Sequence, residues 1–399
     1  MPSTLVNLYI LILAAFGGFY QIYIHPLLKL YGVFDGQVQN IGTRDCYKVE
    51  ELQTLLLNGL VEAVLHQATG VIYFACSNPH NRVGIFNSPH DAQKRVQTRT
   101  ELDYLATYDP STEKVTRLAF TNGFTTEDTS AVHGKDVVPN ASDPKKLWIY
   151  LVNHRVPKGN PPLNGLDSVI EVFETEVGSR SVTHIKTFDY PEYIIHPNDV
   201  VGSPDGKSFY FTNHVYTRTA QNEIFAYFYN VIVKGRSSIG YCHIDKGCKL
   251  AATGLPTNNG LASTGNGTWY LASTFNGGIR IFEEGNDNDL VLVDTIPTKY
   301  GMDNLSIDKN GAVWAAAFPK MFPLLKQMTD INARAPSAVL RLAANTGADN
   351  FYGNKYVLDI PWQDDGALAL GSTTFVHDAD RKRLITTGVM APWVTVCNL

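Results

Sequence analysis

One stretch of this sequence, residues 196–214, constrains the fold more than any other. It reads HPNDVVGSPDGKSFYFTNH and contains a polar Asn198-Asp199 pair, a Ser-Pro-Asp-Gly turn and a short aromatic strand. An Asp-Gly turn followed by aromatic and β-branched residues is typical of a β-hairpin. Because versions of this pattern recur along the chain, it predicts a repeated unit rather than an isolated hairpin.

Six apolar runs with strand character follow turn signals. They start at Gly70, Lys146, Gly206, Gly267, Gly311 and Lys382. Each is mostly β-branched or aromatic, which favours strands. The starts are 44 to 76 residues apart, so the repeat is irregular. Irregular insertions between blades are compatible with a propeller that carries functional loops. We therefore expect an all-β, six-bladed β-propeller.

A polar residue precedes each run by eight to thirteen positions. These residues are Glu62, His133, Asn198, Asn259, Asp303 and Ser372. If the strand before each turn is the innermost one of its blade, the six side chains converge on a central channel. A two-layer sandwich would explain the strands but gives no reason for this phased polar residue.

Two segments depart from the repeat. Residues 49–65 have mixed helix and strand character, and we interpret the first half as a short helix. Lys320 to Met328 (KMFPLLKQM) and Pro336 to Leu342 (PSAVLRL) together predict an insertion around one blade edge.

The beginning of the chain predicts a hydrophobic helix. Residues 5–28 contain no Asp, Glu, Lys or Arg, and at about 1.5 Å per residue they can cross a hydrocarbon layer of about 30 Å. An uncleaved membrane anchor, a cleaved signal peptide and a buried helix are the three alternatives, with the anchor favoured. We divide the chain into residues 1–29, the signal or anchor, and residues 30–399, the propeller. The first two alternatives place the propeller in the secretory pathway, either membrane-anchored or secreted.

The five cysteines fit that compartment. Cys46 and Cys397 lie at the two ends of the folded region, where a disulfide could close a ring. Cys242 and Cys248 could bridge a hairpin, which leaves Cys76 unpaired, and the sequence alone does not fix this pairing. The sequons at Asn140 and Asn266 lie beside turn signals and predict glycans.

Composition excludes one class of partner. The formal net charge is −5, and the chain contains no basic stripe or Lys/Arg run. We therefore expect no binding to nucleic acid.

The convergent polar set has the chemistry of a calcium site. Glu62 and Asp303 offer carboxylates, while Asn198, Asn259 and Asn304 offer neutral amide oxygens. All five are hard donors, and calcium takes six to eight such oxygens in flexible geometry. Taken singly, each Asn or Asp is more simply explained as a turn residue. Asn304 also heads a sequon, but a ligand inside a channel could not carry a glycan, so we predict that it is unmodified.

Histidines supply the second part of a possible catalytic site. His133, His154 and His214 come from adjacent segments of the repeat. Two of them could form a dyad in which one imidazole removes a proton from water and the other orients it, while the metal polarises a carbonyl. A lone histidine is more often a hydrogen-bonded core or surface residue.

Other catalytic motifs are absent from the sequence. It contains no Gly-x-Ser-x-Gly elbow, Walker loop, dinucleotide-binding glycine motif or His-Glu-x-x-His. Ser372, in Gly-Ser-Thr-Thr, is better explained as part of a turn that lines the channel than as a nucleophile.

At these residues the chain resembles the serum paraoxonase/arylesterase family, and more distantly gluconolactonases and strictosidine-synthase-like propellers. The resemblance covers about residues 40 to 399 in order. The segments that carry it are VHGKDVV, LVNHR, HPNDVVGSPDGKSFYFTNH, LPTNNGLAS, GMDNLSID, GALALGSTT and TVCNL.

The resemblance implies roles for individual residues. It implies that the catalytic calcium is bound by Asn198, Asn259, Asp303 and Asn304, and that His133 and His154 form the dyad with His214 as a further channel histidine. It also implies a disulfide between Cys46 and Cys397 and a retained hydrophobic N-terminal segment.

A second, structural calcium is implied through Asp199, with the backbone oxygen of Lys135 as a partner. Two positions depart from the family pattern. Ala63 stands where paraoxonases have an aspartate after the glutamate, so only one carboxylate is present. We assign Glu62 to the catalytic calcium, because the related gluconolactonase-type propellers also use a single glutamate there, and the second site then loses a carboxylate. Phe318 stands where they have a histidine, which predicts a more apolar substrate pocket.

The sequence thus predicts calcium-dependent hydrolysis of lactones or aryl esters, with phosphotriesters as possible side substrates. The alternative is a calcium-binding propeller that serves as a binding or structural module, like strictosidine-synthase-like proteins, without esterase activity.

Overall fold

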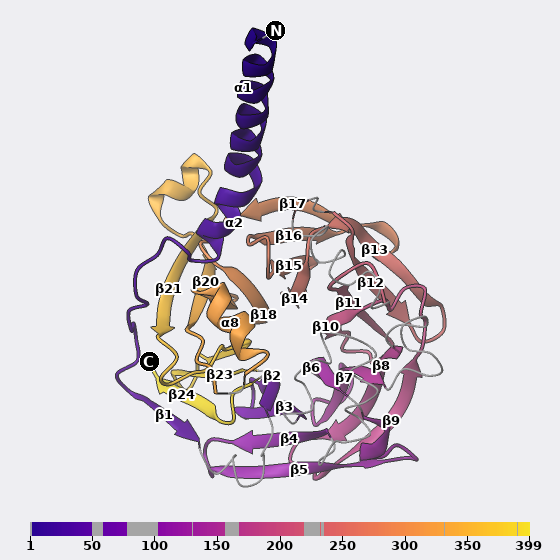
Figure 1. Cartoon of the computed structure of the whole chain (residues 1–399). Helices are drawn as coiled ribbons and strands as arrows, with labels where there is room; N and C mark the ends of the chain where they lie inside the picture. Colours follow the sequence, from indigo (N-terminus) through magenta and orange to yellow (C-terminus); the bar gives the residue numbers. More distant parts are fainter. Residues whose placement is uncertain are drawn as a thin grey trace.

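As predicted, the protein folds as a six-bladed β-propeller whose innermost strands surround a central axis (Figure 1). The space around this axis is termed the tunnel. This computed structural model describes residues 2–49, 59–77, 103–129, 131–155, 167–218, 232, 235–330, 332–388 and 390–399, without the side chains of 2–4, 59–61, 349 and 352. The helix expected for the first half of residues 49–65 falls on residues 50–58, outside these ranges.

Each blade is a four-stranded antiparallel sheet whose innermost strand lies next to the tunnel. From that strand outward, blade 1 contains β2 (Gly59–His66), β3 (Val71–Ser77), β4 (Tyr104–Asp109) and β5 (Lys114–Thr121). Blade 2 contains β6 (Val132–Pro139), β7 (Lys146–Arg155), β8 (Asp167–Glu176) and β9 (Ser181–Phe188). Blade 3 contains β10 (Pro197–Gly202), β11 (Ser208–Asn213), β12 (Ser237–His243) and β13 (Gly247–Leu255).

Blade 4 contains β14 (Asn258–Ser263), β15 (Thr268–Ser273), β16 (Ile279–Glu284) and β17 (Leu290–Ile296). Blade 5 contains β18 (Gly301–Ile307), β19 (Val313–Phe318), β20 (Ser337–Ala344) and β21 (Tyr356–Asp364). Blade 6 contains β22 (Thr374–Asp378), β23 (Arg383–Thr387), β24 (Val394–Asn398) and, at its outer edge, β1 (Cys46–Val49).

The six apolar runs of the sequence are the second strands of the blades, β3, β7, β11, β15, β19 and β23. The strand before each run is therefore the innermost one, as predicted. Each innermost strand contacts the next around the ring, and β22 contacts β2. One irregularity links blades 1 and 2: their outermost strands, β5 and β9, pair in parallel at Ala119↔Ser181, which joins the two blades into one eight-stranded sheet.

Apolar side chains fill the spaces between neighbouring blades. Between blades 1 and 2, for example, Leu105 of β4 packs in one cluster with Leu147 of β7 and Phe173 of β8. Burying a large apolar side chain stabilises the fold by about 1.5 to 3 kcal/mol. This packing leaves the tunnel as the place where polar side chains gather.

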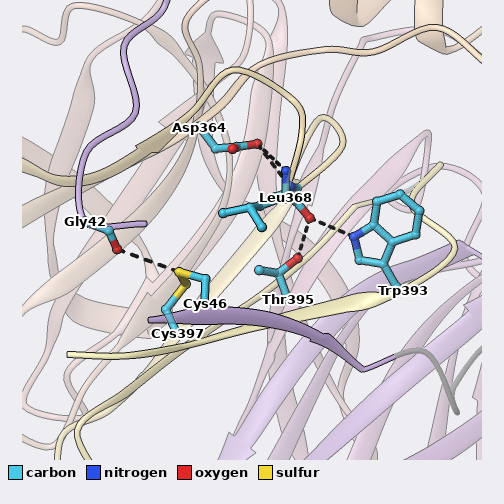
Figure 2. The surroundings of a disulfide bond; sticks show 8 residues. Gly42, Cys46, Asp364, Leu368, Trp393, Thr395 and Cys397 are labelled. Atoms are coloured by element: carbon cyan, nitrogen blue, oxygen red, sulfur yellow. Dashed lines mark hydrogen bonds between the residues drawn. A yellow bond between two sulfur atoms is a disulfide. The ribbon is translucent and has the colours of Figure 1, made fainter. Parts of the chain in front are cut away.

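The ring is closed by joining the two ends of the propeller. Strand β1 pairs with β24, and Cys46 lies opposite Cys397 and forms a disulfide with it (Figure 2). A hydrogen-bonded loop supports this corner: the carbonyl of Leu368 accepts from Trp393 Nε1 at 2.8 Å and from Thr395 Oγ1 at 2.7 Å. The predicted closing disulfide is confirmed.

Loss of this disulfide is expected to destabilise the propeller strongly. The bond joins residues 351 positions apart, so it removes much entropy from the unfolded chain. Replacing both Cys46 and Cys397 by serine should lower the free energy of unfolding in guanidinium by about 2 to 5 kcal/mol. The control removes the second disulfide, Cys242–Cys248, which spans only six positions. An equal or larger loss in that control would contradict the role of ring closure.

The remaining cysteine, Cys76, is free and buried, as the pairing of the other four requires.

Part of one predicted insertion is a blade strand. The prediction that PSAVLRL belongs to an insertion is wrong, because Ser337–Ala344 is β20, the third strand of blade 5. Of the two predicted pieces, the preceding helix α8 (Met321–Gln327) is the insertion. A short apolar run such as PSAVLRL does not by itself show whether it is a strand of the blade or part of an insertion.

Among the described residues, the other short elements are the 3₁₀ turns η2 (Thr126–Asp128), η4 (Asn286–Asn288) and η5 (Ala348–Tyr352). The hydrophobic N-terminal helix is confirmed: α1 (Pro2–Phe19), the π-helical turn η1 (Tyr20–Ile24) and α2 (His25–Leu30) form one segment that projects from the ring (Figure 1). Within residues 5–30, an 18-residue window has a mean hydropathy of 1.8, and the segment could cross a membrane by length and composition. At the base of this segment, Lys320 Nζ donates to the carbonyl of Gly32 at 2.6 Å.

Candidate active site

Bulges in the innermost strands place the polar residues at one level of the tunnel. In β6, β10, β14 and β18, two residues lie opposite one residue of the next strand. The paired residues are 133–134, 198–199, 259–260 and 303–304, and β2 has an irregularity just before Glu62. A bulge re-aims side chains that regular pleating would send to opposite faces. Both members of Asn198-Asp199 and of Asp303-Asn304 are thereby positioned near the tunnel.

Close backbone contacts keep these bulges together. A Cβ atom added to Gly134 would lie 2.2 Å from the carbonyl oxygen of Asn198, and one added to Gly260 would lie 2.6 Å from the Cα of Asn304. Only glycine allows neighbouring strands to approach so closely. The two glycines therefore hold β6 against β10 and β14 against β18 at the level of the polar residues.

Threonine hydroxyls orient two of the tunnel amides. Asn259 Nδ2 donates to Thr274 Oγ1 at 2.8 Å, and Asn304 Nδ2 donates to Thr374 Oγ1 at 3.0 Å. These contacts turn each amide so that its oxygen faces away from the threonine. Neither threonine was predicted from the sequence, although Thr274 is equivalent in its blade to His154 and His214.

Two buried amide oxygens here have no hydrogen-bond partner. They are Oδ1 of Asn198 and Oδ1 of Asn259, and both side chains are less than a tenth exposed. An unpaired buried oxygen costs about 1 to 3 kcal/mol, so native proteins rarely keep it without a ligand. These two atoms are therefore candidate ligands for a bound cation or an ordered water.

Glu62 and Lys135 lie together beside this level. The Glu62 carboxylate accepts from the backbone N–H of Lys135, and Lys135 Nζ donates to the carbonyl of Glu62 at 2.8 Å. Burial raises the pKa of Glu62 and lowers the pKa of Lys135, while their mutual attraction opposes both shifts. Asp303 raises the pKa of Glu62 further, so these two carboxylates are close enough to repel each other.

Two more aspartates link the innermost strands through backbone amides. Asp136 of β6 accepts from the N–H of Gly202 in β10 at 2.9 Å. Asp199 of β10 accepts from the N–H of Leu261 in β14 at 2.7 Å and from its neighbour Val200 at 2.7 Å. Burial raises the pKa of both aspartates. The predicted role of Asp199 as a ligand of a second calcium stays a prediction.

Four histidine rings form a row at the end of the tunnel where the innermost strands begin. His133 Nδ1 lies 3.2 Å from His154 Nε2. The ring centres of His154 and His196 are 5.9 Å apart, and those of His196 and His214 are 6.2 Å apart. His154 Nδ1 lies 2.8 Å from the hydroxyl of Ser168 on β8, so a third residue fixes the orientation of the pair. The structure thus brings together the three predicted histidines.

His196 was not predicted as a site residue, although it opens the stretch 196–214. Asn213 accepts from the N–H of Ile195 and of His196 at 2.9 and 3.0 Å, and its amide donates to Tyr193, so it holds the segment before β10. Burial, together with His154 and His214, lowers the pKa of His196 well below its ordinary value and keeps the ring neutral. The Asn-His pair that is repeated at the ends of β7 and β11 was the signal in the sequence that could have indicated His196. In the second pair, Asn213 orders the segment that carries this histidine.

The predicted substrate-binding residues have different surroundings. His214 is buried, its Nδ1 lies 2.5 Å from the carbonyl of Asn258, and burial lowers its pKa. Phe318 is equivalent in its blade to His154 and packs with Met321 of α8 in an apolar cluster. Ser372 is buried before β22, where its N–H donates to Ser337 Oγ at 2.8 Å. A role for these three in substrate binding stays a prediction.

The two predicted glycan sites lie in turns. Asn140 is half-buried after β6, and Asn266 is exposed between β14 and β15. The third sequon residue, Asn304, is buried, which agrees with the prediction that it is unmodified. Glycosylation itself stays a prediction at Asn140 and Asn266.

A cavity of about 840 Å³ occupies the opposite end of the tunnel from the histidines. Its walls include the last residues of innermost strands, such as His66, Gly202 and Ile307, and it reaches Glu62 and Asp199 at its deep end. None of the four histidines of the row lines it. The polar level therefore separates this cavity from the histidine end.

The donor set at the polar level fits a hard divalent cation. Within the described ranges, no group of three or more His, Cys, Asp or Glu side chains could hold a metal. The candidate donors are instead two carboxylates, Glu62 and Asp303, and the amides of Asn198, Asn259 and Asn304. Oxygen-only donors are typical of hard cations rather than of zinc or copper, and two of these amide oxygens have no hydrogen-bond partner.

The fold and tunnel together define a class: six-bladed propellers with an oxygen-rich centre beside a histidine pair. The model of the arylesterase family matches residues 114–399, which is most of the chain. The chain belongs to the arylesterase family.

Individual relatives are more distant. Serum paraoxonase/lactonase 3 of Oryctolagus cuniculus is 27% identical over 235 residues, which cover 57% of this chain and 58% of the relative. The match therefore spans little more than half of that protein. Among solved structures, the chain resembles a luciferin-regenerating enzyme with a TM-score of 0.49 and 13% identity, over 89% of this chain and 95% of that one. It also resembles a gluconolactonase from Xanthomonas campestris, with a TM-score of 0.48 and 13% identity over 91% and 94%.

Proposed function

We propose that this protein hydrolyses carboxylic esters, either lactones or aryl esters, in a calcium-dependent reaction at the histidine end of the tunnel. The observation that carries the proposal is the 3.2 Å contact between His133 of β6 and His154 of β7. Strand β6 contacts β2 and β10, which carry two of the oxygen donors. Membership in the arylesterase family supports the same reaction class.

His133 acts as the general base. Its Nδ1–H donates to His154 Nε2, and His154 Nδ1–H donates to Ser168 Oγ at 2.8 Å. With these tautomers, Nε2 of His133 carries no hydrogen and is the ring nitrogen that can accept a proton from water. His154 accepts the hydrogen bond that stabilises the imidazolium of His133 after proton transfer, and Ser168 fixes the ring of His154.

The oxygen donors hold calcium through Glu62, Asn198, Asn259, Asp303 and Asn304. When bound, calcium supplies a Lewis acid that polarises an ester carbonyl and stabilises negative charge on its oxygen. The threonines behind Asn259 and Asn304 keep the amide oxygens oriented before the ion binds, which reduces the cost of ordering them.

An apolar wall beside the histidines favours an acyl or aryl group over a charged one. The ring of Phe275 lies 6.1 Å from the ring of His214, and Phe275 packs against the cluster that contains Phe318. We propose that this wall binds the hydrophobic part of a small ester. The apolar N-terminal helix and the two disulfides support a location in the secretory pathway, with the helix as membrane anchor or signal.

A substrate panel tests this function. The purified chain, loaded with calcium, is expected to hydrolyse phenyl acetate or a γ- or δ-lactone with saturable kinetics, measured by absorbance or pH-stat titration. A panel without turnover, combined with thermal stabilisation by calcium, would favour the alternative of a calcium-binding propeller without esterase activity.

A further inference from the structure

A buried lysine beside the calcium ligands is the feature that the reaction does not use. Lys135 is 2% exposed and is among the largest fully buried side chains of the described residues. A buried ammonium is costly unless it is hydrogen-bonded and near negative charge. Its Nζ donates to the carbonyl of Glu62 at 2.8 Å, and its charge interacts with Glu62, Asp136 and Asp199.

The surroundings of Lys135 do not fit a second metal ion. Ala63, next to Glu62, offers a methyl group in an apolar cluster. Both carboxylate oxygens of Asp199 already accept backbone N–H groups. At the proposed calcium site, in contrast, Asn198 and Asn259 each have a buried side-chain oxygen without a hydrogen-bond partner.

The charge of Lys135 leads to the same conclusion. Its side chain interacts electrostatically with the carboxyl groups of Glu62, Asp136 and Asp199. A second divalent ion held by these carboxylates would lie close to the buried ammonium of Lys135, and two buried positive charges repel each other.

We propose that the ammonium of Lys135 takes the place of a second metal ion, as a covalently attached internal cation, so that the propeller binds one calcium ion rather than two. The proposal rests on the proposed calcium site. The side chain is covalently attached, so the inner strands β2, β6 and β10 stay joined when calcium is removed.

Counting calcium ions tests the proposal without using activity. Protein purified in calcium and then desalted is analysed by atomic emission for calcium per chain. The wild-type protein is expected to hold one ion, and Lys135→Met is expected to hold two, because the carboxylates regain an uncompensated charge. Lys207→Met, at an exposed position, is the matched control and should hold one.

Thermal melting in chelator gives a second readout. Lys135→Met is expected to melt at a lower temperature than wild type in chelator and to gain more from added calcium. The double variant Lys135→Met/Asp136→Asn removes one charge of each sign, so it should recover part of the loss and hold one ion.

The outcomes separate this inference from the proposed function. Two ions in the wild type would overturn the role of Lys135 and leave the calcium-dependent function intact. No ion in the wild type would overturn the proposed calcium site itself. One ion in Lys135→Met, with wild-type melting in chelator, would also refute the inference. If neither Lys135→Met nor Lys135→Met/Asp136→Asn folds in calcium, Lys135 is required for packing rather than for charge, and the inference fails.

Discussion

Replacing His133 by glutamine is expected to lower kcat/KM for ester hydrolysis by about 10²- to 10⁴-fold. Glutamine keeps a polar side chain of similar size but cannot accept and carry a proton at neutral pH. Because His133 lies on the bulge of β6 and its ring contacts His154 rather than the apolar core, the thermal stability should change little. Steady-state kinetics with the best substrate of the panel, together with a melting curve, measure both effects.

His243→Gln is the matched control for this prediction. His243 lies at the end of β12, where its Nδ1 accepts from the N–H of Asp245 in a turn. This variant should retain wild-type kinetics. A His133→Gln enzyme with more than a tenth of wild-type kcat/KM would require another base, and His214 would then be the next residue to replace.

The second large effect is expected from removal of calcium or of its ligand Asp303. Excess chelator should abolish turnover, and added calcium should restore it. Asp303→Asn replaces one of two carboxylates by a neutral amide, so it should weaken calcium binding and lower kcat at fixed calcium by about 10²- to 10³-fold. The half-buried position of Asp303 at a strand bulge suggests that the fold tolerates the change.

Calcium titrations of activity distinguish a ligand from a structural residue. In Asp303→Asn, the calcium concentration for half-maximal activity should rise, while in the exposed control Asp245→Asn it should match wild type. Full activity of the wild type in excess chelator would refute the calcium mechanism. An Asp303→Asn variant with unchanged calcium dependence of activity would show that Asp303 is not a calcium ligand.

The chain encodes the ring itself in local signals. Each turn signal precedes the second strand of a blade, from Gly70 to Lys382, because Asp-Gly and Asn-Gly turns and β-branched runs act over a few residues. The sequence also indicated the closing disulfide, since Cys46 and Cys397 lie at the two ends of one closed ring. In contrast, PSAVLRL was misinterpreted because the residues of a short apolar run do not show which strand of a blade the run forms.

The sequence by itself determined which residues precede each turn and that most of them offer hard oxygen atoms. Strict alternation, however, would have sent Asn198 and Asp199 to opposite faces, and Asp303 and Asn304 likewise. Only the pairing of each innermost strand with its neighbour creates the bulges that bring such adjacent residues to one level.

Tertiary structure alone decided the remaining features of the site. His196 joins the histidine row because Asn213, seventeen positions later in the chain, holds its backbone. Lys135 becomes an internal cation because β6 lies against β2 and buries its side chain near carboxylates from three strands. Such contacts depend on the free energy of burying charges that are distant in sequence, and no local pattern of residues carries that information.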